Sequence, residues 1–339
     1  MKDTEKYTHE EPEEPEQREE QAEGKPASQQ YDPSGDQDEE QEAPEAVVDE
    51  DGEPLVVEKS PEETLAALQE RQEEADEQAR ALRETASSEP ETTNESGEPP
   101  VITIKGLRKA FKDHEVLRGV DLRVNKGENL VVLGKSGSGK SVLIKCLVGL
   151  EWPDEGEVNI FGKDLLTLTY PELNEVRVRT GFLFQNAALY DSMTVRENLA
   201  FPLRQHKKDM TDEKKHSLIL EMLENVGLED SIDQMPSKLS GGQSKRIGLA
   251  RTLILRPELM LYDEPTTGLD TGTAKEISEL MIKMKKKYNI SSITITHDMP
   301  CAKLTADRII MMREGVVVAE GTYEELEKSD DEWIKSFFY

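Results

Sequence analysis

The sequence predicts an α/β protein whose core is a parallel β-sheet with helices on both faces. The part of the chain after residue 100 contains apolar runs separated by helical patterns. The runs are LVVLG from residue 130, LMLY at 259–262, SSITIT at 291–296 and RIIMM at 308–312. Strands that are apolar at nearly every position are buried on both faces, which is typical of parallel sheets. Two other observations complete the prediction: an alternating segment before the first run, and a long acidic segment before both.

The acidic segment, residues 1–100, differs in composition from the rest of the chain. It holds 34 acidic and 8 basic residues, a net charge of −26, whereas the other 239 residues hold 37 and 34, a net charge of −3. It is rich in Glu, Gln, Pro and Ser, so it cannot bury enough apolar surface to offset the entropy lost on ordering. We predict a mostly disordered extension over 1–100, with a possible short helix at 64–85, and a domain over 101–339. A surface that is acidic throughout, as in salt-adapted proteins, is the alternative, and the balanced charge of the domain argues against it.

Two further parts are expected beside the parallel sheet. Residues 101–124 alternate apolar and polar side chains between turn signals, which predicts short antiparallel strands. Residues 194–235 are rich in charge and mostly helical in pattern, so we predict a helical subdomain over about 190–245. Cys146 and Cys301 lie in apolar surroundings without a CxxC spacing, and we expect both in the core of a protein from a reducing compartment. No apolar run approaches the ~18 residues that a membrane span needs.

A polar, glycine-rich turn joins the first apolar run to a helical pattern. Its sequence GKSGSGKS, at 134–141, fits G-x-x-x-x-G-K-[ST], the phosphate-binding loop. The glycines let backbone N–H groups curl around phosphate oxygens, and the following helix directs its positive end at them. Lys140 is expected to reach the β- and γ-phosphates and Ser141 to ligate Mg²⁺. The expected nucleotide-binding residues here are Gly134, Lys135, Ser136, Gly137, Ser138, Gly139, Lys140, Ser141 and Val142.

Two acidic residues follow the apolar run at 259–262. A carboxylate at the end of a buried strand beside a phosphate loop is suited to hold Mg²⁺, and that is the expected role of Asp263. Glu264 is then placed to orient and deprotonate an attacking water. The alternative is that the pair caps a helix and interacts with its dipole. The neighbouring phosphate loop favours the catalytic interpretation.

The segment LSGGQ, at 239–243, opens a second predicted helix. A serine cap followed by two glycines exposes N–H groups at the positive helix end, which makes a second anion cradle. An ordinary serine cap is the alternative. Because a nucleotide has one γ-phosphate, two cradles indicate a two-fold dimer with nucleotide between the loop of one copy and this helix of the other. The residues expected to contact nucleotide there are Ser240, Gly241, Gly242 and Gln243.

These segments, with LMLYDE at 259–264, stand in the order and spacing of an ATP-binding cassette (ABC) ATPase, which the chain resembles from about residue 101 to its end. The resemblance implies ATP and Mg²⁺ as cofactors and a P-loop NTPase (RecA-like) core with an antiparallel β subdomain and a helical subdomain. It implies that Gln185 takes part in catalysis and touches Mg²⁺ and the membrane subunit, and that His297 contacts the γ-phosphate. Asp270 matches the loop that the family calls the D-loop. Phe111 stands where an adenine-stacking tyrosine is usual, and its ring can still stack. Taken singly, a histidine such as His297 is more often a structural residue and an aromatic such as Phe111 is more often part of the core, but here both stand in register with the other motifs.

Within the family, residues 139–150 and 181–206 look closest to MlaF-type ATPases, which energise lipid transport between bacterial membranes. That resemblance implies an MlaE-like permease and an MCE-type lipid-binding protein such as MlaD as partners, and a homodimer at the cytoplasmic face of the inner membrane. The alternatives are the ATPase of another ABC transporter, a soluble ABC protein acting on ribosomes or DNA, and a division-type ABC scaffold. A soluble ABC protein is disfavoured because such proteins carry two cassettes in one chain or a long coiled-coil insertion, and the sequence pattern predicts neither. An acidic segment would also repel phosphate backbones, so no nucleic-acid partner is expected. The scaffold is disfavoured because every catalytic position is filled.

Overall fold

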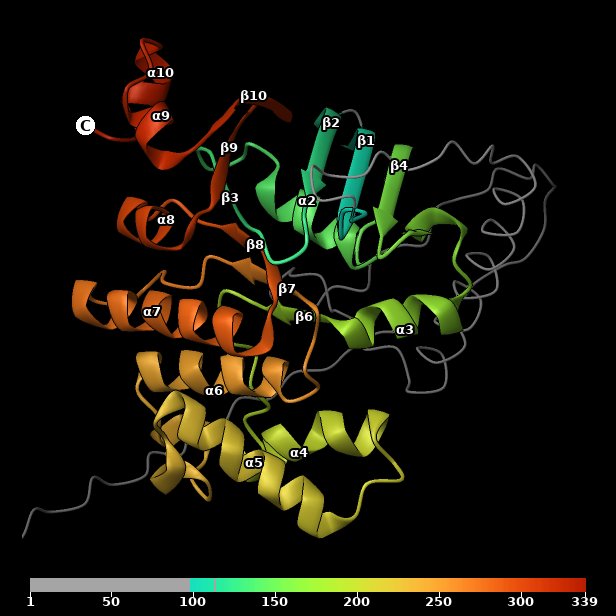
Figure 1. Ribbon diagram of the computed structural model, residues 1–339, viewed down its shortest axis with the longest axis vertical. Helices are drawn as coiled ribbons and strands as arrows, with labels where there is room; N and C mark the ends of the chain where they lie inside the picture. The colour runs from blue at the N-terminus through green and yellow to red at the C-terminus, as the bar shows by residue number, and fades with distance from the viewer. Residues whose placement is uncertain (1–97, 113) are drawn as a thin grey trace, which may run out of the picture. The chain divides into compact units, whose positions relative to one another are not determined.

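The computed structural model describes residues 98–112 and 114–339, which form two β-sheets and the helices that cover them (Figure 1). The predictions for residues 1–97, including the helix at 64–85, lie outside the described residues. The domain boundary near residue 100 therefore stays a prediction. Within the described residues, no helix is long and apolar enough to cross a bilayer.

The smaller sheet is antiparallel, with strand order β2-β1-β4-β5. Strands β1 (Ile102–Phe111) and β2 (His114–Val124) pair where the alternating pattern predicts strands. Strands β4 (Glu155–Ile160) and β5 (Lys163–Asp164) were not predicted and follow the phosphate loop in sequence. In β4 only Val158 and Ile160 are buried, so its apolar pattern is too short to mark a strand.

The larger sheet has the order β10-β9-β3-β8-β7-β6. Strands β3 (Asn129–Leu133), β7 (Leu259–Asp263), β8 (Ser291–Ile295) and β9 (Arg308–Arg313) coincide with the four predicted apolar runs and pair in parallel. The short β6 (Thr180–Leu183) extends the parallel part, and β10 (Val316–Gly321) pairs antiparallel with β9. The predicted parallel core is confirmed, with two additional strands at its edges.

Alternate residues of the central strands belong to different apolar clusters, which shows that the parallel sheet is covered on both faces. In β3, Leu130 and Val132 pack with the small sheet, whereas Val131 and Leu133 pack towards the carboxyl-terminal helices. In β7, Met260 and Tyr262 face a third cluster formed with the long helices. This two-sided burial explains why the strands are apolar throughout.

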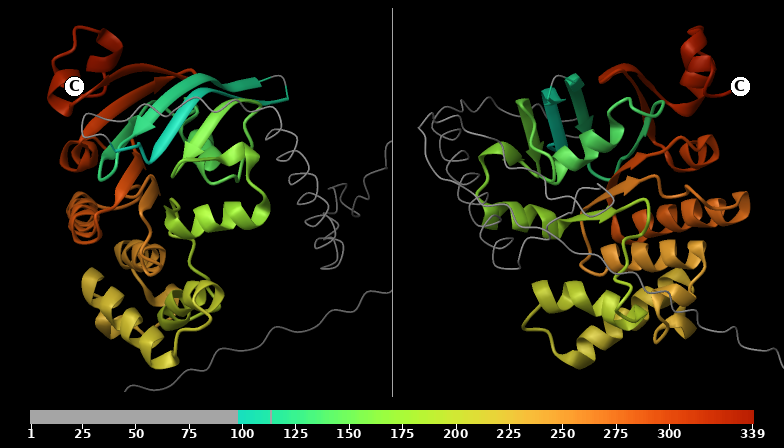
Figure 2. Two further views of the ribbon diagram at one scale, coloured as in Figure 1. Left: turned by 45° about the vertical axis from the view of Figure 1, so that its right-hand side comes forward. Right: turned by 180° about the vertical axis from the view of Figure 1, so that it is seen from behind.

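The helices divide among these clusters (Figures 1 and 2). Helix α2 (Lys140–Leu147) lies against the small sheet, and α3 (Tyr170–Arg179) precedes β6. The long-helix cluster contains α4 (Val195–His206), α5 (Asp212–Val226), α6 (Gly241–Leu253) and α7 (Thr271–Tyr288). The carboxyl-terminal cluster contains α8 (Met299–Thr305), α9 (Tyr323–Glu327) and α10 (Glu332–Lys335). Short 3₁₀ turns occur at Leu165–Thr167, Glu229–Ser231 and Pro236–Lys238.

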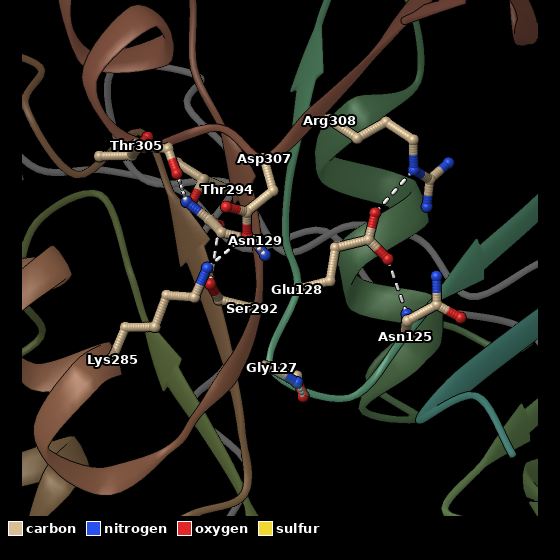
Figure 3. A network of polar contacts seen from close by, with 11 residues as sticks. Asn125, Gly127, Glu128, Asn129, Lys285, Ser292, Thr294, Thr305, Asp307 and Arg308 are labelled. Carbon is tan, nitrogen blue, oxygen red and sulfur yellow. Dashed lines mark hydrogen bonds and ion pairs between the residues drawn. The ribbon is translucent and has the colours of Figure 1, made fainter. Parts of the chain in front are cut away.

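A buried polar network joins the amino ends of three parallel strands (Figure 3). The Asn129 side chain, at the start of β3, donates to the Thr305 carbonyl at 2.6 Å and accepts from the hydroxyls of Ser292 at 2.7 Å and Thr294 at 3.3 Å. The Asn129 backbone N–H donates to Asp307, just before β9, at 2.7 Å. Because every bond crosses between elements, the network sets the register of β3, β8 and β9. The opposite ends of these strands then emerge at one edge of the sheet.

Candidate active site

The loop at 134–139 leaves the carboxyl end of β3 and enters α2. A Cβ atom on Gly134 would lie 2.5 Å from the Met312 carbonyl oxygen and 2.6 Å from Ser138 Oγ. Gly139 has φ 98°, and a Cβ there would lie 2.9 Å from the Val116 carbonyl oxygen. Only glycine fits at either position, and the first N–H groups of α2 have no acceptor within the helix.

A cavity of about 860 Å³ opens over this loop. It joins the loop to side chains that are far apart in sequence and that come from the ends of β6, β7 and β8. The residues lining it are His114, Val116, Gly134, Lys135, Ser136, Gly137, Ser138, Gly139, Lys140, Ser141, Val142, Gln185, Glu264, His297, Ser336 and Phe337. All predicted residues of the loop are therefore brought together with Gln185, Glu264 and His297.

Lys140 is the buried cation of this cavity. Its Nζ donates to the carbonyl oxygens of Gly134 at 2.7 Å and Lys135 at 3.1 Å, so the ammonium is held by its own loop. Burial lowers the pKa of Lys140, and the charges of Glu264 and Asp263 oppose that shift. An ammonium that has lost much of its hydration gains more from a bound anion than an exposed one does. The loop can therefore bind a polyphosphate through both its N–H groups and this cation.

Ser141 and Asp263 offer oxygen atoms at the same place. The Ser141 hydroxyl donates to Asp263 Oδ1 at 3.5 Å, across the gap between α2 and the end of β7. Burial raises the pKa of Asp263, and the neighbouring Glu264 charge raises it further. A nearby cation would lower that pKa again. A hydroxyl and one carboxylate suit Mg²⁺, which usually takes one or two carboxylates together with phosphates and waters. Among the described residues there is no cluster of three or more His, Cys, Asp or Glu side chains that would suit a metal held by protein alone.

Glu264 is oriented by an unusual backbone conformation. Its φ is 49°, a left-handed value that is strained for a residue with a side chain. Its N–H donates to the Ile295 carbonyl at 2.9 Å, and its Oε2 accepts from Thr267 Oγ1 at 3.0 Å. His297 Nδ1 lies 2.9 Å from the same oxygen. These contacts direct a carboxylate into the cavity, where it can take a proton from a water.

Five of the other predicted nucleotide contacts do not line this cavity. Ser240 and Gln243 cap α6 reciprocally: the Gln243 N–H donates to Ser240 Oγ at 3.2 Å and the Ser240 N–H donates to Gln243 Oε1 at 2.9 Å. Gly241 and Gly242 form the first turn of that helix. Asp270 caps α7 by accepting from the N–H groups of Gly272 and Thr273, both at 3.0 Å. Their contact with nucleotide stays a prediction, and it requires a second copy of the chain.

Phe111 also lies outside the cavity lining. Its side chain is exposed, at 41% relative accessibility, and Lys109 Nζ lies 5.3 Å from its ring centroid. His114, Val116, Ser336 and Phe337 line the cavity instead and were not predicted. Val116 belongs to the alternating β2 pattern, whereas Ser336 and Phe337 follow the last helix and carry no spacing that links them to the loop.

The two cysteines are buried and unpaired, as predicted. Burial raises the pKa of Cys146 to about 12 and also raises the pKa of Cys301. Neither thiol ionises readily, so neither is a candidate nucleophile.

The chain is similar to known proteins. The family described as "ABC transporter" matches residues 117–267. The chain is 38% identical over 242 residues to the methionine import ATP-binding protein MetN 1 of Bacillus licheniformis, covering 70% of this chain and 72% of that protein. It is 39% identical over 229 residues to the L-cystine import ATP-binding protein TcyN of Bacillus subtilis, covering 67% of this chain and 87% of that protein. It spans 60% of the length of similar methionine import proteins from Brucella species.

A solved structure is also similar to this chain. The ATP-binding cassette MJ0796, in a dimeric post-hydrolysis state bound to ADP and Pi, has a TM-score of 0.61 and 32% sequence identity. The match covers 65% of this chain and 98% of that one. The predicted fold class, a P-loop core with antiparallel and helical parts, is confirmed.

Proposed function

The chain belongs to the ABC transporter ATP-binding family, and we propose that it is the subunit that drives a membrane permease by hydrolysing ATP. As a cassette of this family it is an ATPase that binds ATP with Mg²⁺. The observation that carries the proposal is one cavity that joins a phosphate loop, an oriented carboxylate and a histidine. A division-type scaffold needs no such carboxylate.

In the proposed mechanism each residue has one task. Lys140 and the N–H groups of the loop bind the phosphates. Ser141 and Asp263 would hold Mg²⁺, which would supply positive charge beside the phosphates. Glu264 accepts a proton from the attacking water. His297 fixes the Glu264 carboxylate through Nδ1 and faces the γ-phosphate. Gln185, at the cavity wall, would contact the metal and follow movements of the permease.

We also propose that two copies enclose the nucleotide. Ser240 and Gly241, at the capped amino end of α6, are exposed and do not line the cavity. An anion cradle of this kind serves the γ-phosphate held by another copy. The solved dimer of MJ0796 with ADP and Pi supports this arrangement. Ser240→Arg should bind ATP normally but fail to dimerise in light scattering, whereas a Ser240→Arg protein that dimerises with ATP would exclude this contact.

The cargo has two candidates. Amino-acid import is the first, because the relatives named above are methionine and L-cystine import proteins. These two relatives are almost equally identical to this chain, yet they are named for different amino acids. Sequence identity alone therefore does not identify the cargo. Lipid transport with MlaE-like and MlaD-like partners is the second candidate, and residues 139–150 and 181–206 favour it. On the comparisons, amino-acid import is the better supported of the two.

The proposed contact with the permease lies beside Gln185. Phe184 and Tyr190 are exposed at 39% and 44%. The Tyr190 ring lies 5.0 Å from that of Phe201 on α4. Asn198 is fully buried and fixes the turn below them by donating to the carbonyls of Tyr190 at 3.1 Å and Met193 at 3.0 Å. A fixed turn that presents aromatic rings suits an amphipathic permease helix, which would hold the chain at the membrane face.

Reconstitution tests the function and the cargo together. The full chain is purified with the proposed permease and placed in liposomes with ATP inside or outside. ATP-dependent uptake of labelled methionine or cystine supports the first candidate, and ATP-dependent transfer of a labelled phospholipid supports the second. A Glu264→Gln protein should bind ATP·Mg²⁺ but move neither. Wild-type ATP turnover by Glu264→Gln would refute the proposed site.

A further inference from the structure

One face of α6 holds the segment that contains Gln185. Lys245 Nζ donates to the Gln185 carbonyl. Arg251 donates to the carbonyls of Ala188 at 2.8 Å and Ala187 at 3.1 Å. Between them stands Gly248, where an added Cβ would lie 2.9 Å from the Ala187 Cβ. Positions three apart lie on the same side of a helix, so α6 contacts residues 185–188 along two turns.

The backbone of this segment needs such support. Ala187 and Ala188 have φ values of 57° and 49°, in the left-handed region that residues with side chains rarely adopt. Strained backbone persists only where several contacts hold it. Arg251 bonds to the carbonyls of both left-handed residues, and Lys245 bonds to the Gln185 carbonyl just before them. The Gln185 segment and α6 therefore form one unit.

Lys245 also bonds to the hydrolytic residue. Besides the Gln185 carbonyl, its Nζ donates to the Glu264 carbonyl at 3.2 Å. Lys245 is buried, at 6% relative accessibility, and its pKa is lowered by that burial although Glu264 and Asp263 oppose the shift. Burying an ammonium is unfavourable unless its protons are bonded, and an apolar side chain would fill this space at lower cost. The ammonium is therefore explained by its bonds rather than by packing.

The Glu264 carbonyl is the point at which this bond matters. Glu264 has φ 49°, and its N–H is bonded to Ile295 at 2.9 Å. Those contacts hold one side of the strained peptide, and Lys245 holds the other. A rotation of this backbone would swing the carboxylate away from the cavity.

We propose that Lys245 is a positioning residue that couples the Gln185 segment and α6 to the Glu264 carboxylate. The inference rests on the proposed role of Glu264 as the base. When the Gln185 segment is displaced, the bond through Lys245 passes that displacement to the Glu264 backbone. Arg251 extends the same connection outward, since it also lies 3.5 Å from Asn198 Oδ1 and 5.6 Å from the Tyr190 ring. A movement of the permease at Tyr190 thus reaches the hydrolytic carboxylate without passing through the phosphate loop.

Substitution of Lys245 by methionine tests the coupling, because methionine keeps the apolar stem and removes every donor. In the full-length chain, K245M should lower kcat about 30- to 100-fold, since misplacing a reacting group by ~1 Å costs about that factor. The KM for ATP and the affinity for ATP·Mg²⁺ should stay within about twofold. Lys245→Gln keeps N–H donors and should recover part of the lost kcat. Arg246→Met is the matched control, because Arg246 pairs with Glu276 instead. It should keep wild-type kcat.

A double-variant cycle separates positioning from a purely structural role. If Lys245 acts through Glu264, the K245M change should slow the Glu264→Gln enzyme by less than about twofold. A structural defect would slow it by the full factor seen in the wild-type background. Full additivity, or a K245M enzyme with wild-type kcat, would overturn the inference. If K245M does not fold, the same cycle is run with Lys245→Gln. Wild-type turnover by the Glu264→Gln single variant would instead refute the proposed role of Glu264 as the base. Failure of the Lys245 inference and failure of the proposed base therefore give different results.

Discussion

The two ends of the main sheet use buried polar groups in opposite ways. At the amino ends, the Asn129 amide finds bonding partners in Ser292, Thr294 and Thr305. At the carboxyl ends, the pKa of Lys140 is lowered and that of Asp263 is raised. Glu264 there also has a strained backbone, with φ 49°. Polar groups at the amino ends are matched to one another, whereas those at the carboxyl ends are arranged for a ligand. The same strands therefore provide stability at one edge and chemistry at the other.

Glu264→Gln should show the largest difference between an effect on kcat and an effect on the free energy of unfolding. The amide keeps the size of the side chain but cannot accept the proton, so kcat should fall about 1,000-fold, within the range for losing a general base. The free energy of unfolding should change little, because the substitution also removes the repulsion between Glu264 and Asp263. Phosphate release and denaturant unfolding measure the two effects. Glu276→Gln, which alters a surface ion pair with Arg246, is the control and should leave both unchanged. A large loss of stability in Glu264→Gln would contradict the separation.

Lys140→Ala should have the next largest effect. It removes the cation from the loop, and the affinity for ATP·Mg²⁺ should fall about 100-fold, since charge-assisted bonds to phosphate are among the stronger ones. Titration with a fluorescent ATP analogue measures this loss. Lys163→Ala, which removes an exposed partner of Glu175, should not change the affinity. Affinity within twofold of the wild type in Lys140→Ala would exclude the loop as the main phosphate site.

The sequence predicts those residues of the carboxyl edge that belong to short, recognisable motifs. The loop at 134–141 and the Asp263-Glu264 pair follow apolar runs, and parallel strands bring such ends to one edge. Lys245 could not be found this way, because its bond to Gln185 joins positions 60 residues apart. Phe337 follows the last short helix and reaches the cavity only through the tertiary fold. Of the strands that the sequence did not predict, β5, β6 and β10 lie at the edges of their sheets. In β4 only Val158 and Ile160 are buried, so its apolar pattern is weak.

Asn129→Ala tests the stabilising edge. It would leave the Thr305 carbonyl and the Ser292 hydroxyl without their buried partner, and an unsatisfied buried group costs about 1–3 kcal/mol. The free energy of unfolding should therefore fall by about 3 kcal/mol, while kcat of the folded protein should stay within about twofold. Denaturant unfolding and ATPase assays at low temperature measure both quantities. Loss of kcat with normal stability would show that the two edges are not independent.

The smallest effect is expected at the rim of the carboxyl edge, where Phe337 is a candidate to stack on the adenine in place of Phe111. Phe337 lines the cavity, whereas Phe111, at the family's usual position, does not. Stacking of a base on an aromatic ring contributes about 1–3 kcal/mol, so Phe337→Ala should weaken ATP binding about 10-fold. Binding of inorganic triphosphate, which has no base, should stay unchanged. Phe338→Ala is the control, because Phe338 packs against Tyr323, with ring centroids 5.1 Å apart, and is absent from the cavity lining. Calorimetric titration of the variants with both ligands decides the question. If Phe111→Ala alone weakens ATP binding, the adenine follows the family pattern, and the ring of Phe337 serves only the carboxyl-terminal core.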